Sequence, residues 1–88
     1  MKYKLTSETK EVFGTKLYRI EALMDFDGIE KGDKGGFVEK EENLSQKGNA
    51  WVHGDALVFG NAQVYDNAQV SGNAQIFGDA QVFGNAWV

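Results

Sequence analysis

The sequence of 88 residues contains no cysteine and no proline. Without cysteine, neither disulfide bonds nor thiolate metal sites can stabilise the fold. Without proline, no residue in the chain is barred from donating to a ladder of strands. The sequence also lacks an apolar run long enough for a signal peptide or a membrane span, so we expect a cytoplasmic protein. A chain of this length forms one structural domain at most.

Basic residues are absent from the C-terminal half of the chain. All nine lysines and arginines lie at or before Lys47, and beyond it the only acids are Asp55, Asp66 and Asp79. The formal net charge of −4 is too small to indicate a mimic of DNA, and its sign argues against binding of nucleic acid. The composition changes at Lys47/Gly48, which is the clearest internal boundary of the sequence.

In place of charge, the C-terminal half contains a six-residue repeat. Between Gly48 and Val88 the chain reads GNAWVH, GDALVF, GNAQVY, DNAQVS, GNAQIF, GDAQVF and GNAWV. A period this regular is typical of stacked repeat architectures. Alternation within Ala-x-Val places Ala and Val on one side of a three-residue strand and x on the other. Gly followed by Asn or Asp suits the tight corner between two such strands.

If three hexads make one coil, residues 18 apart are stacked neighbours, about 4.8 Å apart. This spacing predicts that Phe59 lies over Phe77 and Tyr65 over Phe83. It also places Gln69 between Trp51 and Trp87. The last coil would end at Val88 with an open edge, which predicts end-to-end dimerisation or a chain shorter than the natural protein.

The segment before the repeat is less regular. We expect strands at 2–6, 11–13 and 16–24, a polar turn at 7–10, and a hairpin connection at Gly14-Thr15. Residues 25–36 are rich in glycine and charge and are expected to form a loop. Four acids of this loop (Asp25, Asp27, Glu30 and Asp33) do not have the offsets that a calcium loop requires, so we predict no metal site there.

Carried backward, the hexad frame extends into the segment before Gly48. It gives two degenerate units, Gly36–Glu41 and Glu42–Lys47, with Val38 and Leu44 at the Ala position. We therefore divide the single structural domain into an N-terminal β cap and loop, residues 1–35, and a hexapeptide-repeat region, residues 36–88.

The V-x-G-N-A-x pattern resembles the hexapeptide-repeat, left-handed parallel β-helix family. The longer string GDKGGFVEKEENLSQKGNAWVHGDALVFGNA is similar to bacterial and phage hexapeptide proteins often labelled as transferases. The resemblance implies an all-β fold, a single-stranded parallel β-helix with three hexads per coil, preceded here by an N-terminal antiparallel β cap. It also implies a homo-oligomer, either a trimer, which is common in that family, or a dimer.

The resemblance raises the question of acyltransferase activity. Enzymes of that class present a histidine from a loop beside a groove that holds acyl-coenzyme A. The only histidine of this chain is His53, inside the first clear hexad, with Asp55 two residues on as the one candidate to orient it. No loop interrupts the hexads, and no basic residue after Lys47 can meet the phosphates of the cofactor. We therefore predict no catalytic residue and no bound cofactor, and keep a minimal acyltransferase-like protein as the alternative.

The x positions of the hexads carry all the tryptophan, tyrosine and phenylalanine residues of the repeat. These are Trp51, Phe59, Tyr65, Phe77, Phe83 and Trp87. Exposed aromatic residues clustered on a small domain usually mark an interaction surface, although the N-terminal segment could instead fold over them. We predict a non-catalytic module that self-associates and binds a protein partner, without nucleic acid or membrane. Because the resembling proteins include phage proteins, one version is a phage-encoded inhibitor of a host enzyme or defence complex.

Overall fold

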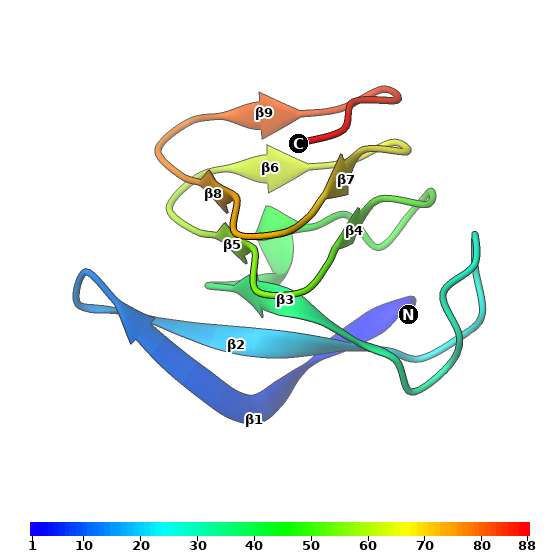
Figure 1. Cartoon of the computed structure of the whole chain (residues 1–88), viewed down its shortest axis with the longest axis horizontal. Coiled ribbons are helices and arrows are strands. Elements are labelled where there is room, and N and C mark those ends of the chain that lie inside the picture. The colour runs from blue at the N-terminus through cyan, green and yellow to red at the C-terminus, as the bar shows by residue number, and fades with distance from the viewer.

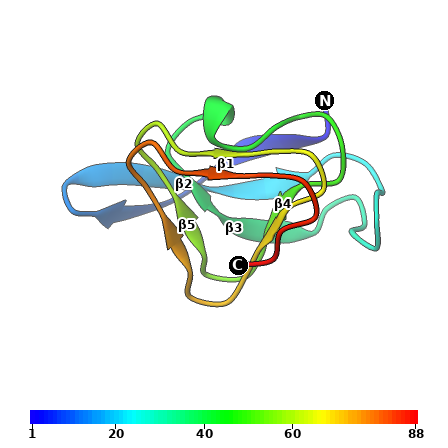
Figure 2. The ribbon, with the colours of Figure 1, turned by 90° about the horizontal axis from the view of Figure 1, so that it is seen from above.

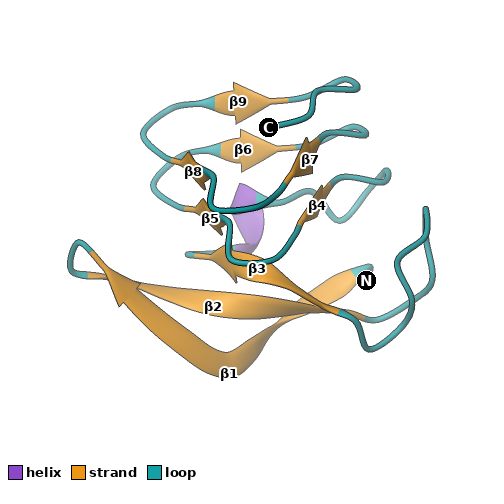
Figure 3. Ribbon diagram, viewed as in Figure 1, coloured by secondary structure: helices purple, strands orange, loops and turns teal.

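The computed structural model describes residues 1–88, and the fold is all-β (Figures 1 and 3). Three longer strands come first: β1 (Tyr3–Val12), β2 (Thr15–Ala22) and β3 (Lys34–Val38). A short 3-10 helix, η1 (Glu41–Asn43), follows. The rest of the chain forms two-residue strands: β4 (Trp51–Val52), β5 (Leu57–Val58), β6 (Gln63–Val64), β7 (Gln69–Val70), β8 (Gln75–Ile76) and β9 (Gln81–Val82). Strand length therefore drops where the hexads begin.

β1 and β2 form the predicted hairpin, but its turn lies one residue earlier than expected. Phe13 and Gly14 occupy the corner with φ of +52° and +77°, the pair of left-handed residues that a type I′ connection needs. The polar segment 7–10 is strand rather than the predicted turn, with a register shift between Leu5 and Thr9. Its side chains are exposed, so their polarity reflects solvent contact and not a chain reversal.

The hairpin and the repeat share one mixed sheet. Its order is β1-β2-β3-β5-β8, with antiparallel pairs as far as β3 and parallel pairs beyond it. Two further sheets, β4-β7 and β6-β9, have two parallel strands each. The prediction of a single-stranded parallel β-helix is therefore wrong, because the chain forms mixed antiparallel and parallel sheets that do not close. The reason is that β3 pairs with the hairpin along one edge and with β5 of the repeat along the other, so that the hairpin and part of the repeat share one sheet.

The predicted division at residues 35/36 falls inside β3. Gly35 and Gly36 are buried there, and a Cβ atom on Gly36 would lie 2.5 Å from the carbonyl oxygen of Ala56. Two consecutive residues without side chains thus let β3 pass close beneath the first hexads. The glycines that indicated a loop are in part a packing requirement of this strand.

Stacked chain segments follow β3, and we call each group of three strands a circuit. The first circuit runs through β3, the bridge at Leu44 and β4, the second through β5, β6 and β7, and the third through β8, β9 and the bridge at Trp87. Figure 1 shows the circuits above the hairpin, and Figure 2 shows them from above as a three-sided outline. The pairs Trp51–Gln69, Leu57–Gln75 and Gln63–Gln81 have the expected spacing of 18 residues.

The first circuit is two residues longer than the others. Val38 pairs with Val58 and Leu44 with Val64, a spacing of 20, so both occupy the Val position of the hexad and not the predicted Ala position. The spacing returns to 18 at Trp51. The two additional residues therefore lie between Leu44 and Trp51, where a strict frame carried backward slips.

The main core lies inside the circuits and continues under the hairpin. The inward alanines of the first two circuits are fully buried, and Val52, Val58, Val64 and Val70 lie beside them. Tyr3 and Ile20 reach this cluster from the hairpin. Each buried CH₂ group contributes about 0.8 kcal/mol, so a core of small side chains depends on many such contacts. No helix of the structure has the length and apolar character needed to cross a membrane.

Candidate interaction surface

Four of the six predicted aromatic residues form two stacked pairs. The rings of Phe59 and Phe77 have centroids 5.5 Å apart and planes 14° apart. Those of Tyr65 and Phe83 are 5.4 Å and 11° apart. The stacking follows from the 18-residue spacing, which places equal positions of successive circuits above one another. We call these pairs the aromatic columns.

Each aromatic column has an anchored lower ring and an exposed upper ring. Phe59 is half-buried against the small cluster of Leu17, Phe37 and Leu57, while Phe77 is 57% exposed. Tyr65 is also half-buried, and its hydroxyl donates to Oε1 of Gln81 at 3.2 Å. Phe83 above it is 53% exposed. The upper rings are therefore held in position by their partners while most of their surface faces water.

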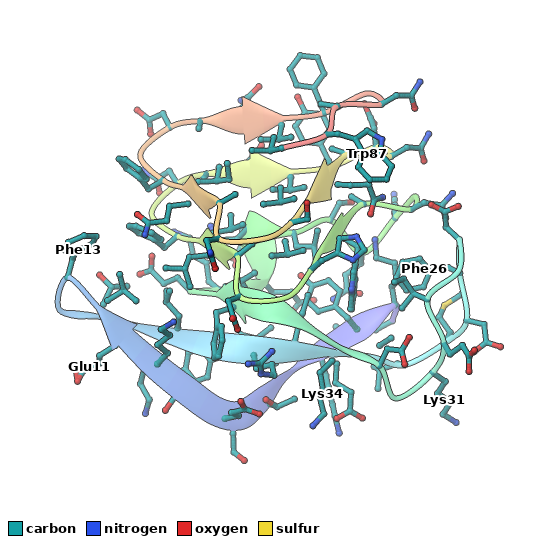
Figure 4. All side chains as sticks on the ribbon, viewed as in Figure 1. Glu11, Phe13, Phe26, Lys31, Lys34 and Trp87 are labelled. Carbon is teal, nitrogen blue, oxygen red and sulfur yellow. The ribbon has the colours of Figure 1, made fainter.

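Trp51 does not belong to the surface, which corrects the prediction for this residue. Its side chain is 1% exposed. Tyr3 and Phe26 contact its ring edge-on, with centroids 6.2 and 5.3 Å away. Figure 4 shows Phe26 on the loop that follows the hairpin, beside the first circuit. The N-terminal segment thus covers the outward face of the first circuit, as the alternative interpretation of the sequence allowed.

Trp87 is the most exposed tryptophan of the chain, at 78%. It lies in the third circuit, bridged to Gln69, which in turn pairs with Trp51. Figure 4 shows it near the upper end of the stack. The order Trp51, Gln69, Trp87 is the one that the 18-residue spacing predicts, but of the two tryptophans only Trp87 exposes its ring to solvent.

His53 and Asp55 do not meet. Nε2 of His53 lies 2.6 Å from Oε1 of Gln69, an amide that also donates to the carbonyl of Asn49. The carboxylate of Asp55 instead lies 3.8 Å from the guanidinium of Arg19. None of the hollows on the surface is lined by His53. The carboxylate and the groove that a histidine base would use are therefore not found around it.

Two of the four acids in the 25–33 loop bond to its backbone. Oδ1 of Asp25 accepts from the amide of Lys31 at 2.8 Å, and Oδ2 of Asp33 accepts from the amide of Glu30 at 2.9 Å. No group of three or more histidines and carboxylates in the chain is arranged to hold a metal ion. These contacts are the turn chemistry of Asp side chains.

The residues that close the lower end of the circuits were not predicted. Nζ of Lys2 donates to the carbonyls of Gly48 and Ala50, at 3.3 and 2.7 Å, and lies 5.0 Å from the centre of the Phe26 ring. Burial lowers the pKa of Lys2 from 10.5 to about 8. Burial, with the nearby charges of Glu41 and Glu42, raises the pKa of Tyr3. A lysine near the N-terminus is expected at the surface. Lys2 is buried because its ammonium group bonds to carbonyls that are far away in the sequence.

Asn43 closes the same end. Its side chain is fully buried, accepts from the amides of Glu39 and Lys40, and donates to the carbonyls of Gly60 and Ala62. The carboxylate of Glu39 accepts from the amide of Gly60 at 2.8 Å. In the hexad frame carried backward, Asn43 falls at the Asn position, like the other corner asparagines. Its four bonds distinguish it, because the corner asparagines of the third circuit are exposed.

The exposed aromatic columns thus lie in the part of the chain that has no basic residue and few acids. Comparison with known proteins adds no assignment: no protein-family model matches the chain, and no curated protein matches it significantly.

Proposed function

We propose that this chain is a non-catalytic interaction module that self-associates and binds a protein partner through its aromatic columns. The observation that supports the proposal is the arrangement of Phe77 and Phe83. Both rings are more than half exposed, yet each is stacked on a ring that is anchored in the fold. Rings fixed in this way lose little side-chain entropy on binding, so burial of their surface goes largely into affinity.

The charge of the region favours a protein as the partner. A nucleic-acid site needs lysine or arginine beside its aromatic residues, and none follows Lys47. The concrete form that we propose is an inhibitor encoded by a phage, acting in the cytoplasm of the infected bacterium on a host enzyme or defence complex. This form rests on the resemblance of the sequence and on the small size of the chain.

The test compares the wild-type chain with the double variant Phe77→Ser/Phe83→Ser. Both are used to capture partners from the native host, and the captured protein is then purified and titrated by calorimetry. We expect the double variant to bind at least about 10-fold more weakly, because two buried rings contribute well over 1.4 kcal/mol. Phe13→Ser is the matched control, since Phe13 is 83% exposed but lies at the hairpin tip (Figure 4).

Equal affinity of the wild type and the double variant would contradict the proposal. So would binding of acyl-coenzyme A that the substitution His53→Ala abolishes, since that result would support the transferase alternative.

A further inference from the structure

The upper edge of the third circuit carries backbone amides without partners. In the second circuit the equivalent amides donate to carbonyls of the third circuit; they belong to Phe59, Asn61, Tyr65, Asn67 and Gln69. The amides 18 residues further on have no hydrogen-bond partner in the chain; they belong to Phe77, Asp79, Phe83, Asn85 and Trp87. A row of free donors on a strand edge is a template for pairing with another strand.

The same edge offers acceptors. In a parallel ladder, the N–H and C=O of one residue point to the same side. Gln63 directs both toward β9, since its amide donates to the carbonyl of Ala80. Gln81, its equivalent one circuit higher, therefore directs both away from the stack. By the same argument, Gln75 and Trp87 direct both outward. Each of the three segments of the third circuit thus has one residue able to donate and to accept.

The apolar interior also opens at this end. Ala56, Ala62 and Ala68 are at most 1% exposed. The alanines 18 residues further on are half-buried or exposed, because no circuit lies above them; they are Ala74, Ala80 and Ala86. With Ile76, also only half-buried, they present the apolar face that a further layer would cover.

Resting on the self-association proposed above, we infer that a second copy of this chain covers the end, with the two third circuits face to face about a two-fold axis through β9. Gln81 of each copy then pairs with Gln81 of the other, exchanging two N–H···O=C bonds in an antiparallel pair. β8 of each copy lies against the segment around Trp87 of the other. Donors and acceptors are matched because both copies present the same edge.

The pitch of the circuits selects this axis. One circuit rises by the roughly 4.8 Å that separates stacked strands. Because a circuit has three segments, each segment lies roughly 1.6 Å above the one before it. An axis through β9 pairs the middle segment with itself and the lowest with the highest, so both pairs have the same separation. An axis through β8 or through Trp87 leaves one pair separated from the other by a full circuit.

Charge is compatible with this arrangement. Asp79 is the only charged side chain between Asn67 and Val88. The axis through β9 exchanges the two corners beside that strand, which places Asp79 of one copy opposite Asn85 of the other. The chain already stacks this pair of residue types, with Asn61 donating to Asp79 at 3.5 Å. No carboxylate meets its own copy.

The opposite end is a poor partner for an upper edge. β2 pairs with β3 there, and Lys2 and Asn43 occupy carbonyls of the circuits above. The free strand edge at that end belongs to β1, whose exposed polar residues and register shift between Leu5 and Thr9 disfavour pairing with another strand. A two-fold contact between two upper edges, in contrast, closes at two copies.

The test is sedimentation equilibrium of the full chain with two variants and a control. Ala80→Glu puts a charge on the apolar end, and Asn85→Asp places carboxylates opposite Asp79. Both residues are exposed in a single copy, so neither substitution disturbs its fold, which circular dichroism checks. We expect a wild-type mass of twice 9.7 kDa and dimerisation weakened at least about 10-fold in both variants. Thr9→Glu, on exposed β1 at the other end, leaves the dimer unchanged.

Amide hydrogen exchange provides the second measurement. We expect the Gln81 and Trp87 amides to be protected in the wild type at dimer-forming concentrations and to exchange at least about 10-fold faster in Ala80→Glu. A wild type that stays monomeric at about 1 mM overturns the inference. So does a trimer, or a dimer that resists Ala80→Glu but is lost in Phe77→Ser/Phe83→Ser. Partner binding by the Ala80→Glu variant separates the two proposals: if it is retained, the proposed function stands whether or not the end dimerises.

Discussion

The two ends of the stacked circuits are built from the same kinds of strand but are finished in different ways. At the lower end, residues outside the seven regular hexads supply side chains that bond to backbone groups: Lys2, Glu39, Asn43 and Gln46. At the upper end, the hexads continue to the last residue and nothing occupies the equivalent groups. The contrast teaches that a regular repeat generates edges, and that closing an edge needs irregular sequence.

The two ends also differ in what their aromatic residues do. Tyr3 and Phe26 at the lower end pack edge-on against Trp51 and bury it. Phe77, Phe83 and Trp87 at the upper end remain more than half exposed. The same hexad position therefore supplies a core residue, Trp51, in the first circuit and a surface residue, Trp87, in the third. Three predictions test this contrast.

The largest expected effect is at the lower end, in Asn43→Leu. Removing the amide leaves the Lys40 N–H and the carbonyls of Gly60 and Ala62 without their side-chain partner, while the Glu39 N–H keeps the carbonyl of Val58. We expect the free energy of unfolding to fall by about 3 kcal/mol or more. Asn85→Ala, at an exposed corner of the upper end, should cost less than about 0.5 kcal/mol. Urea unfolding at equal protein concentration measures both. A loss below about 1 kcal/mol for Asn43→Leu would show that its bonds do not close this end.

A second pair of substitutions compares two glycines. An alanine Cβ atom at Gly36 would lie 2.5 Å from the carbonyl oxygen of Ala56 and 2.7 Å from Cγ1 of Val52. Gly78, in the third circuit, has no atom within 4 Å of that position, but its φ is +66°. We expect Gly36→Ala to cost about 2–3 kcal/mol, because backbone must move, and Gly78→Ala about 1 kcal/mol, from the left-handed conformation alone. Thermal unfolding distinguishes them, and equal losses would contradict the close approach of β3.

The smallest effect is the pH dependence that Lys2 confers. Because burial lowers its pKa from 10.5 to about 8, the folded chain holds this proton more weakly than the unfolded chain. The contribution of Lys2 to stability should therefore rise with pH between about 8 and 10.5, and stay at its lower level below about 8, where both states are protonated. Relative to Lys2→Met, we expect a gain on the order of 1 kcal/mol, in which the titration of Tyr3 cancels. If the difference in stability between the wild type and Lys2→Met did not change with pH in this range, the ammonium group of Lys2 would be solvated and not buried.

Much of the repeat was predictable from the sequence. The spacing of 18 residues, the stacking of Phe59 on Phe77 and the inward Ala and Val positions all follow from a six-residue period. The fold class was not predicted correctly, because the period says nothing about β3, where the hairpin and the repeat meet. The hexad positions assigned before Gly48 were wrong for a related reason. Two residues inserted in a corner keep the hydrophobic pattern but shift it by two positions.

The candidate surface was predicted in part. Phe77, Phe83 and Trp87 are exposed as expected, whereas Trp51 is buried by residues some 25 and 48 positions away in the chain. Burial of an outward-facing residue depends on what packs over it, and such long-range contacts leave no local pattern. The roles of Lys2 and Asn43 were not predicted, because their hydrogen-bond partners are backbone groups or residues distant in sequence, and neither leaves a local pattern.

The sequence by itself determined the local structure of the C-terminal half: short strands, tight corners and side chains that alternate between interior and surface. These depend on neighbouring residues and on a period that repeats them. Only the tertiary structure decided which edges of the strands are occupied and which are free, since a hydrogen bond from Lys2 or Asn43 joins residues that no period relates. The difference between a closed lower end and an open upper end therefore belongs to the fold, and the proposed dimer depends on it.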